Sequence, residues 1–153
     1  MHRKLNHRLV AAFIALLALG AVAVYAQVKR PYHNGSVWSV GLIRVKAGME
    51  PAYMNYLAGQ WKAEQEAEKK EGLILSYKVL TTEGHDSDDW NLMLLTEYKD
   101  LATMEANEAK SDALAQKVVG DDQKQMAGYR ERSEIREIVG NRLAREIVLE
   151  PKM

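Results

Sequence analysis

Two segments near the centre of the chain decide the fold: Leu73–Thr81, LILSYKVLT, and Trp90–Tyr98, WNLMLLTEY. Both are rich in β-branched, aromatic and other apolar residues, a composition that favours strands. A short polar stretch, EGHDSDD at 83–89, separates them. Two strands joined by so short a loop are expected to pair antiparallel. The centre of the chain is therefore predicted to be a β-hairpin.

Another strand is predicted before this hairpin. Val37–Val45, VWSVGLIRV, has the composition of a strand. Residues 27–36 precede it and are expected to form a lead-in, in which the Asn34-Gly35 pair is typical of a turn.

A helix is predicted between this strand and the hairpin. Glu50-Pro51 opens it, because proline is well tolerated in the first turn of a helix. Apolar side chains then recur at intervals of four and form one stripe, at Tyr53, Leu57 and Trp61. The helix becomes strongly polar after this stripe and is expected to end at Gly72.

A second helical region and a last strand follow the hairpin. Asp100 is a natural N-cap for the helix, which is interrupted near Gly120 and continues over 121–132. Asn141–Leu149 has strand composition, whereas residues 133–140 fit either a helix end or an extended lead-in. The predicted order is β-α-β-β-α-β, an α+β ferredoxin-like fold with a four-stranded antiparallel sheet and two helical segments on one face. The domain is expected to cover 37–149, with a tail at 150–153.

The predicted strands carry apolar residues on both of their faces. An antiparallel sheet with one face in water should alternate apolar and polar residues, but Leu92–Leu95 is apolar throughout. Strand one is similar, with Trp38, Val40 and Leu42 on one side and Val37, Ile43 and Val45 on the other. Two helices cover one face only, and a large apolar patch is rare on monomers. A second copy of the chain is therefore the expected cover, most simply through two-fold symmetry.

The strand order, the apolar third strand ending in TEYKD (96–100) and the helix beginning Leu101-Ala102 resemble the dimeric α+β barrel superfamily. Its small members include the antibiotic-biosynthesis-monooxygenase-like domains, and the resemblance covers about residues 37–149. It implies a homodimer, and an activity such as cofactor-free oxygenation or the handling of haem. Several members carry a histidine about nine residues after the strand-three tyrosine. Here that position is Asn107, which argues against a histidine-dependent activity.

The first 26 residues form the pattern of a secretory signal peptide. A basic head with Arg3, Lys4 and Arg8 precedes an uncharged stretch, 9–26, that ends in the small-x-small sequence Val24-Tyr-Ala26. We expect cleavage near Ala26 and a periplasmic or secreted protein. The alternative is a retained membrane anchor over 9–26, a stretch at the lower limit of a membrane span.

The remaining composition excludes several functions. Without the leader, 18 basic residues face 21 acidic residues, a balance that does not favour nucleic-acid binding. The absence of cysteine excludes disulfides, thiol nucleophiles and cysteine-ligated metals. His85 lies among Asp86, Asp88 and Asp89, but this is also the composition of a solvated hairpin loop, and no metal site is predicted.

The candidate ligand-binding residues are polar and aromatic side chains within the predicted strands and the first helix. Ser76, Lys78, Asn91 and Glu97 share one parity of the hairpin, and buried charged groups there would have shifted pKa values. A cross-strand Lys–Glu pair at the sheet edge is the alternative reading. The aromatic residues either line a pocket for a planar ligand or form the core. The candidate set is Trp38, Tyr53, Trp61, Tyr77, Lys78, Trp90, Asn91 and Glu97.

These features predict an exported homodimeric α+β barrel protein that binds a small apolar or aromatic molecule. No cofactor is predicted, and the catalytic residues, if the protein is an enzyme, are not identified. One alternative is a cofactor-free monooxygenase or a haem-handling enzyme on the same fold. The other is a structural or interaction protein whose barrel is filled by side chains.

Overall fold

The computed structural model describes residues 30–82 and 89–151. The chain divides into two compact units. The larger, Asn34–Val148, contains the domain; the smaller consists of the two chain ends, in which His33 Nδ1 lies 3.4 Å from Glu150 Oε1. The predicted leader lies outside the described residues. None of the helices within the described ranges is long and apolar enough to span a membrane.

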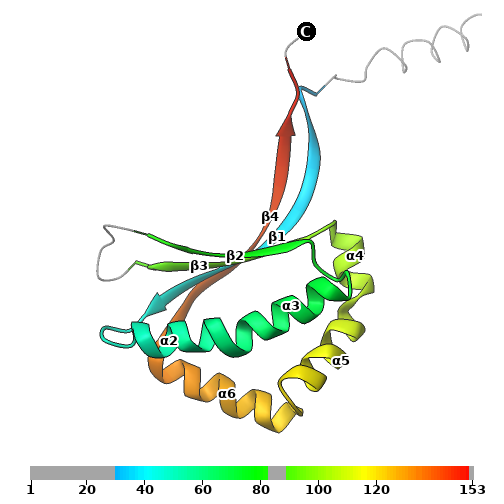
Figure 1. Cartoon of the computed structure of the whole chain (residues 1–153). Helices are drawn as coiled ribbons and strands as arrows, with labels where there is room; N and C mark the ends of the chain where they lie inside the picture. Colours follow the sequence, from blue (N-terminus) through cyan, green and yellow to red (C-terminus); the bar gives the residue numbers. More distant parts are fainter. Residues whose placement is uncertain (1–29, 83–88, 152–153) are drawn as a thin grey trace, which may run out of the picture. The chain divides into compact units, whose positions relative to one another are not determined.

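Four strands form one antiparallel sheet in the order β2-β3-β1-β4 (Figure 1). Their bounds are Tyr32–Val45 for β1, Ser76–Thr81 for β2, Leu92–Tyr98 for β3 and Arg136–Leu149 for β4. The central strand β3 places Leu95 opposite both Val40 of β1 and Lys78 of β2. This order and pairing confirm the predicted ferredoxin-like fold.

The helices lie on one side of the sheet (Figure 1). The first is continuous: α2 (Glu50–Tyr56) passes through a π-helical turn, η1 (Leu57–Trp61), into α3 (Lys62–Lys70). The second region consists of α4 (Leu101–Ala106), α5 (Glu108–Val118) and α6 (Asp122–Ile135). The sequence predicts one break in this region, near Gly120, whereas the structure has a further one at Asn107.

The predicted ends of the helices follow from local chemistry. Pro51 lies in the first turn of α2, and Gly72 follows α3 with φ +70°, a conformation that favours glycine. The predicted cap Asp100 accepts a hydrogen bond from the Thr103 backbone N–H at 2.7 Å. Asp121 caps α6 in the same way, accepting from the Lys124 N–H at 2.9 Å.

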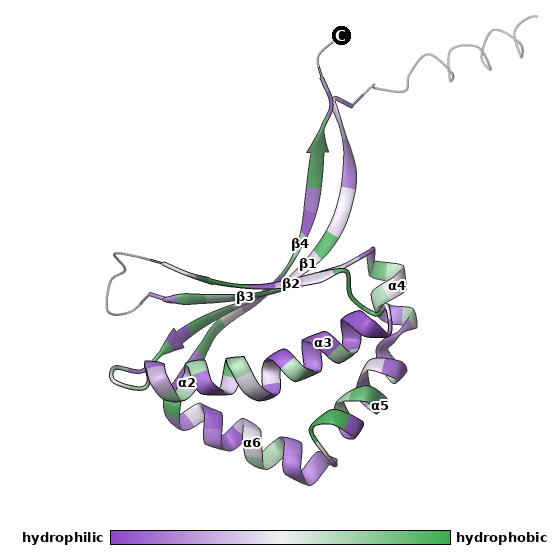
Figure 2. Cartoon of the chain, viewed as in Figure 1, coloured by the Kyte–Doolittle hydropathy of each residue, from purple (hydrophilic) through white to green (hydrophobic). Residues whose placement is uncertain are grey.

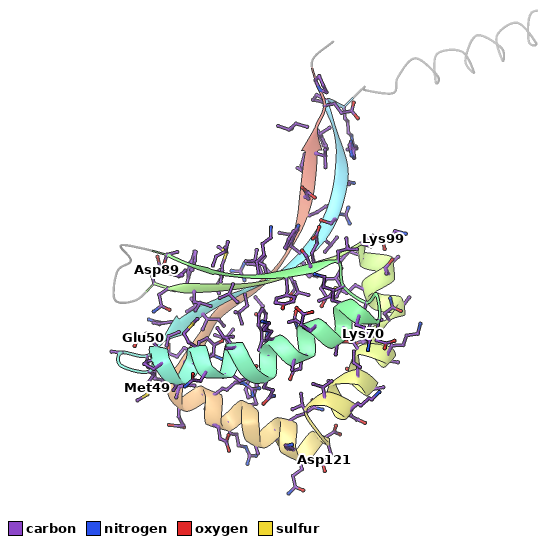
Figure 3. All side chains as sticks on the ribbon, viewed as in Figure 1. Met49, Glu50, Lys70, Asp89, Lys99 and Asp121 are labelled. Carbon is purple, nitrogen blue, oxygen red and sulfur yellow. The ribbon has the colours of Figure 1, made fainter. Side chains whose placement is uncertain are left out.

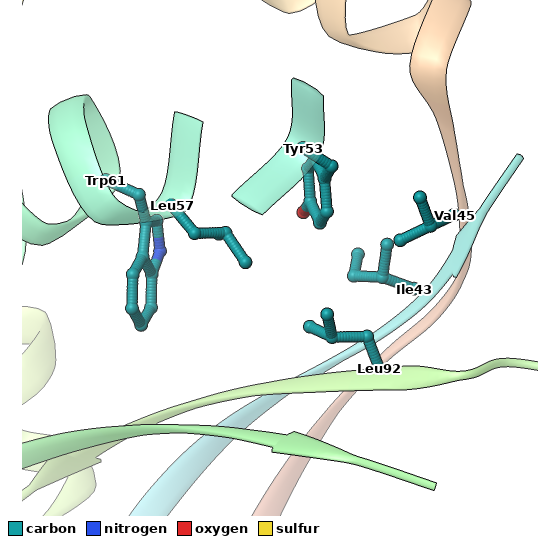
Figure 4. Close-up of a cluster of buried hydrophobic side chains, with 6 residues drawn as sticks. All are labelled: Ile43, Val45, Tyr53, Leu57, Trp61 and Leu92. Atoms are coloured by element: carbon teal, nitrogen blue, oxygen red, sulfur yellow. The ribbon is translucent and has the colours of Figure 1, made fainter. Parts of the chain in front are cut away.

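The core lies between the sheet and the first helix. It consists of Ile43, Val45, Tyr53, Leu57, Trp61 and Leu92 (Figure 4). The predicted apolar stripe of the helix is therefore its buried face. Figure 2 shows α3 as largely hydrophilic, in agreement with the polar second half expected from the sequence.

Two strands are longer than predicted. β1 begins at Tyr32, five residues before the expected start, so the Asn34-Gly35 pair lies within a strand and not in a turn. β4 begins at Arg136 instead of Asn141, while residues 133–135 belong to α6. The reason is that β1 and β4 pair with each other: Ser36 Oγ donates to Glu146 Oε2 at 3.2 Å. Strand pairing of this kind overrides local turn propensity.

Candidate functional site

The sheet face turned away from the helices is termed the outer face. Ile43, Val79 and Leu92 pack in the core on the helix side. The residues that alternate with them along the same strands therefore point to the outer face. The strand register arranges them in three rows across β2, β3 and β1. These are Leu80, Met93 and Leu42; then Lys78, Leu95 and Val40; then Ser76, Glu97 and Trp38. Two rows are almost wholly apolar, and the third is polar at one edge.

The charged groups of the outer face have partners within it. Glu97 Oε2 accepts a hydrogen bond from Ser76 Oγ, and Lys78 Nζ lies 5.1 Å from the centre of the Trp38 ring. The expected shared face of Ser76, Lys78 and Glu97 is therefore present. Their role in ligand binding stays a prediction.

Three other candidate residues lie on the opposite side of the sheet. Tyr53 is fully buried and Trp61 is 9% exposed, both within the core. The Tyr77 ring meets the Trp61 ring edge to face, with centres 5.4 Å apart. Because the sheet lies between these rings and Trp38, the candidate aromatic residues do not form one pocket.

The pKa values of the tyrosines reflect this placement. Burial raises the pKa of Tyr53 to about 12, although the nearby Arg136 charge opposes the shift. The pKa of Tyr77 is raised for another reason, since its hydroxyl donates a hydrogen bond to Glu66. A phenolate is thus disfavoured at both positions, and neither tyrosine is poised as a base near neutral pH.

Asn91 and Trp90 lie just before β3. Asn91 Oδ1 accepts the Val45 backbone N–H at 2.9 Å, which joins the start of β3 to the end of β1. Trp90 is partly buried, and its carbonyl accepts a hydrogen bond from Thr82 Oγ1 at 3.4 Å. Both residues therefore lie apart from the Lys78–Trp38 contact with which the candidate set grouped them.

Asn91 contributes to a cavity of about 310 Å³ at this end of the sheet. Its other lining residues are Val45, Glu50, Met54, Thr81, Thr82 and Leu92. Glu50 is visible at the start of α2 in Figure 3. The volume lies at the lower end of the range of small-molecule sites, and a mainly apolar wall with a few polar groups is typical of them. Glu50, Met54 and Thr82 could not be predicted as one site from the sequence, because only the fold brings them together.

Of the loop residues considered for a metal, His85, Asp86 and Asp88 lie outside the described residues. Within 30–82 and 89–151, no group of three or more histidine and acidic side chains is arranged to hold a metal ion.

Comparisons with known proteins identify relatives by fold alone. No family model matches the chain, and no curated protein does. A NIPSNAP family protein of unknown function from Agrobacterium tumefaciens superposes with a TM-score of 0.50 at 16% identity, covering 79% of this chain and 96% of that one. Likeness at this identity supports the ferredoxin-like α+β fold and carries no activity.

Two further solved structures are similar at lower scores. HapK from Hahella chejuensis has a TM-score of 0.47 and 11% identity, over 72% of this chain and 91% of that one. A dimeric ferredoxin-like protein from an uncultured marine organism has a TM-score of 0.48 and 12% identity, over 78% and 100% of the two chains. No family follows from these matches.

Proposed function

We propose that this protein is a homodimer that covers the outer face with a second copy and binds a small apolar or aromatic molecule. The observation that carries the proposal is the pair of apolar rows on the outer face. Their members on β1, β2 and β3 are Val40, Leu42, Leu80, Met93 and Leu95. Leu80 is 47% exposed although it belongs to a strand whose other face packs in the core.

Burial of these rows supplies the driving force for association. Each apolar side chain removed from water contributes roughly 25 cal/mol per Å² of buried surface. The outer face also carries charges of both signs, among them Lys78 and Glu97, so a two-fold related copy meets opposite charge as well as apolar surface.

The edge strand β4 extends the same proposal. It is 14 residues long and carries exposed apolar side chains at Ile138, Val139, Leu143 and Ile147. A long apolar edge strand is a template for pairing with another chain unless something covers it. A second copy of the chain that covers the outer face and β4 would bury the exposed apolar rows and the exposed edge strand together.

The cavity beside Asn91 is the proposed place of the small molecule. Val45, Met54 and Leu92 supply an apolar wall, while Glu50, Thr82 and Asn91 supply a few polar groups. This composition fits an apolar or aromatic molecule with one polar substituent.

Sedimentation velocity of the full-length chain tests the dimer. The wild type is expected to sediment as two chains, and Leu95→Asp as one chain with an unchanged circular dichroism spectrum. Ala127→Asp adds the same charge on the exposed surface of α6 and should sediment like the wild type. A wild type that sediments as one chain at tens of micromolar, or a Leu95→Asp variant that stays dimeric, contradicts the proposal.

A fluorescent apolar amine, N-phenyl-1-naphthylamine, tests the cavity. Saturable enhancement with one probe per chain is expected for the wild type. It should be lost in Met54→Trp, which fills the cavity, and kept in Met126→Trp, which places the same ring on exposed α6. Equal enhancement in both variants would place the probe elsewhere.

Titration with haem tests the enzymatic alternative on the same fold. A Soret band with a defined stoichiometry would favour a haem-handling protein over the proposed function. Its absence at micromolar protein would remove haem from consideration.

Export belongs to the same proposal and rests on the leader pattern at 1–26. Expression of the full chain in a bacterium with a secretory pathway should yield a mature protein that begins at Gln27. An intact mass that retains residues 1–26 would favour the membrane anchor.

A further inference from the structure

A cluster of tyrosine and arginine side chains lies between α2 and α6, away from both the outer face and the cavity beside Asn91. The Arg132 guanidinium lies 4.6 Å from the Tyr56 ring centre and 5.9 Å from that of Tyr129. The Arg136 guanidinium lies 5.8 Å from both the Tyr53 and the Tyr129 ring centres. Tyr53 and Tyr56 stack with their centres 5.7 Å apart. The result is an alternation of three planar rings and two planar cations.

The cluster has a buried floor and an exposed rim. Tyr53 is fully buried and Arg136 is 9% exposed, whereas Tyr129 is 53% exposed. Three polar atoms in the floor have no hydrogen-bond partner of standard geometry: Tyr53 Oη, Arg132 Nε and Arg136 Nε. Arg132 Nε and Arg136 Nε thus have no acceptor among the described residues, while the Arg136 side chain acts on the Tyr53 hydroxyl as a hydrogen-bond partner.

Neither arginine has an acidic partner within ion-pair distance among residues 30–82 and 89–151. Glu64 is the carboxylate whose charge acts on Arg132 and Tyr56. Its Oε1, however, accepts a hydrogen bond from Gln60 Nε2 at 3.1 Å. Glu64 thus acts on Arg132 from beyond ion-pair distance. Arginine is rarely buried unless it is paired, because an uncompensated charge away from water is costly.

The backbone beside the cluster is also unusual. Tyr56 is the last residue before the π-helical turn η1, which runs from Leu57 to Trp61. Single π-helical turns within α-helices occur frequently at functional sites. This turn changes the direction in which the helix presents its side chains immediately after Tyr53 and Tyr56.

We propose that this cluster binds a small aromatic carboxylate. A guanidinium offers a planar fork of N–H donors that matches a carboxylate in geometry and charge. Arg132 and Arg136 would donate to the carboxylate oxygens. The exposed ring of Tyr129 offers a face on which the aromatic body of the ligand stacks. This site is separate from the proposed dimer contact and from the cavity beside Asn91, so its test does not depend on either.

Calorimetric titration of the purified full-length chain tests the site, with benzoate as the probe. We expect one benzoate per chain and binding weakened about tenfold or more when uncharged benzyl alcohol replaces it, because the charge-assisted hydrogen bonds are lost. Arg132→Gln should weaken benzoate binding by a similar factor. Arg130→Gln is the matched control, because Arg130 is exposed on the same helix and its guanidinium donates to Met126 Sδ at 3.6 Å. The affinity of this variant for benzoate should equal that of the wild type.

A second variant separates recognition of the ring from recognition of the charge. Tyr129→Ala should weaken the binding of benzoate several-fold and leave the binding of acetate unchanged, because it removes a stacking face and no donor. This variant also tests the site if Arg132→Gln fails to fold.

Three results would overturn the proposal. The first is the absence of saturable benzoate binding at millimolar concentrations. The second is equal benzoate affinity in the wild type and in Arg132→Gln; if that variant also melts at a lower temperature, the guanidinium stacks serve only the stability of the fold. The third is inorganic phosphate binding as tightly as benzoate, which would assign the cluster to anions without an aromatic body.

Discussion

The two faces of the sheet are built from alternate residues of the same strands, yet they differ in burial. On the helix side, Ile43 is 3% exposed and Leu92 is 5% exposed. Their immediate neighbours Leu42 and Met93 are only partly buried, and Leu80 on the same row is 47% exposed. Residues of equal hydrophobicity thus occupy two different environments within the single chain.

This difference shows what the apolar content of a strand can and cannot predict. A strand with one wet face alternates apolar and polar residues, whereas a strand buried on both faces does not. The strands here have the second pattern, but the helices of one chain supply cover for only one face (Figure 1). The apolar composition therefore indicates that both faces of the sheet are to be buried, and a second copy of the chain is the cover that we propose for the outer face.

Replacement of neighbouring residues on opposite faces is expected to have the largest effect. Leu92→Ala removes buried apolar volume beside Tyr53 and should lower the free energy of unfolding by about 2–5 kcal/mol at every protein concentration. Met93→Ala should lower it only where the protein is dimeric, because its side chain faces outward in the single chain. Urea titrations across a hundredfold range of protein concentration measure both.

The concentration dependence decides between one covered face and two. If Met93→Ala lowers the free energy of unfolding equally at all protein concentrations, the outer face is stabilised within one chain. If the loss of unfolding free energy in Leu92→Ala vanishes when the protein is diluted, the placement of Leu92 in the core is contradicted.

The helix side also buries a phenol, and this predicts alkaline instability. The pKa of Tyr53 is raised from 10.0 to about 12 by burial, so the folded state holds the proton more tightly than the unfolded state. The contribution of the Tyr53 proton to the free energy of unfolding is fully present below pH 10. It is lost as the pH rises from 10 to 12. The loss should reach roughly 3 kcal/mol. Unfolding followed by circular dichroism against pH should show this loss in the wild type and less of it in Tyr53→Phe; Tyr129→Phe, at an exposed ring, is the control.

Much of the fold was predictable because its signals are local. The stripe of Tyr53, Leu57 and Trp61 identified the buried face of the first helix, and Gly72 identified its end. The ends of β1 and β4 were not predictable in the same way, because Asn34-Gly35 has turn propensity and adopts a strand only through pairing with residues about 110 positions away. Propensity describes a segment by itself, and long-range pairing overrides it.

The candidate site was predictable only in part, for a related reason. Strand parity correctly grouped Ser76, Lys78 and Glu97, since alternation is a local rule. It could not place Trp38 relative to Tyr53, which requires knowledge of the face that the helices cover. The Tyr–Arg cluster was missed because its members come from α2, α6 and the first residue of β4, and Arg136 was expected in a segment of undecided structure. An arginine that follows a polar helix, as Arg136 does, gives no sequence signal that it is buried.

The cap of α6 offers a smaller test of the covered face. Asp121→Ala removes the side chain that accepts the Lys124 N–H and should cost about 1 kcal/mol of stability. Because α6 packs against α2 on the helix side, the variant should leave the sedimentation of the dimer unchanged. Glu131→Ala, exposed within the same helix, is the control for the loss of an acidic side chain. A dimer that dissociates in Asp121→Ala alone would indicate that α6 takes part in the association.

The smallest expected effect concerns the polar edge of the outer face. Lys78 Nζ lies over the Trp38 ring at 5.1 Å, a contact across two strands that is worth about 0.5–1 kcal/mol at an exposed site. A double-mutant cycle with Lys78→Met and Trp38→Leu measures the interaction free energy between the two side chains, because the separate effect of each substitution is subtracted. If the second copy covers this edge, removal of water should strengthen the attraction, so the coupling in the wild-type background should exceed that in the Leu95→Asp background. Equal couplings in both backgrounds would place Trp38 at the wet rim of the contact and confine the buried part to the two apolar rows.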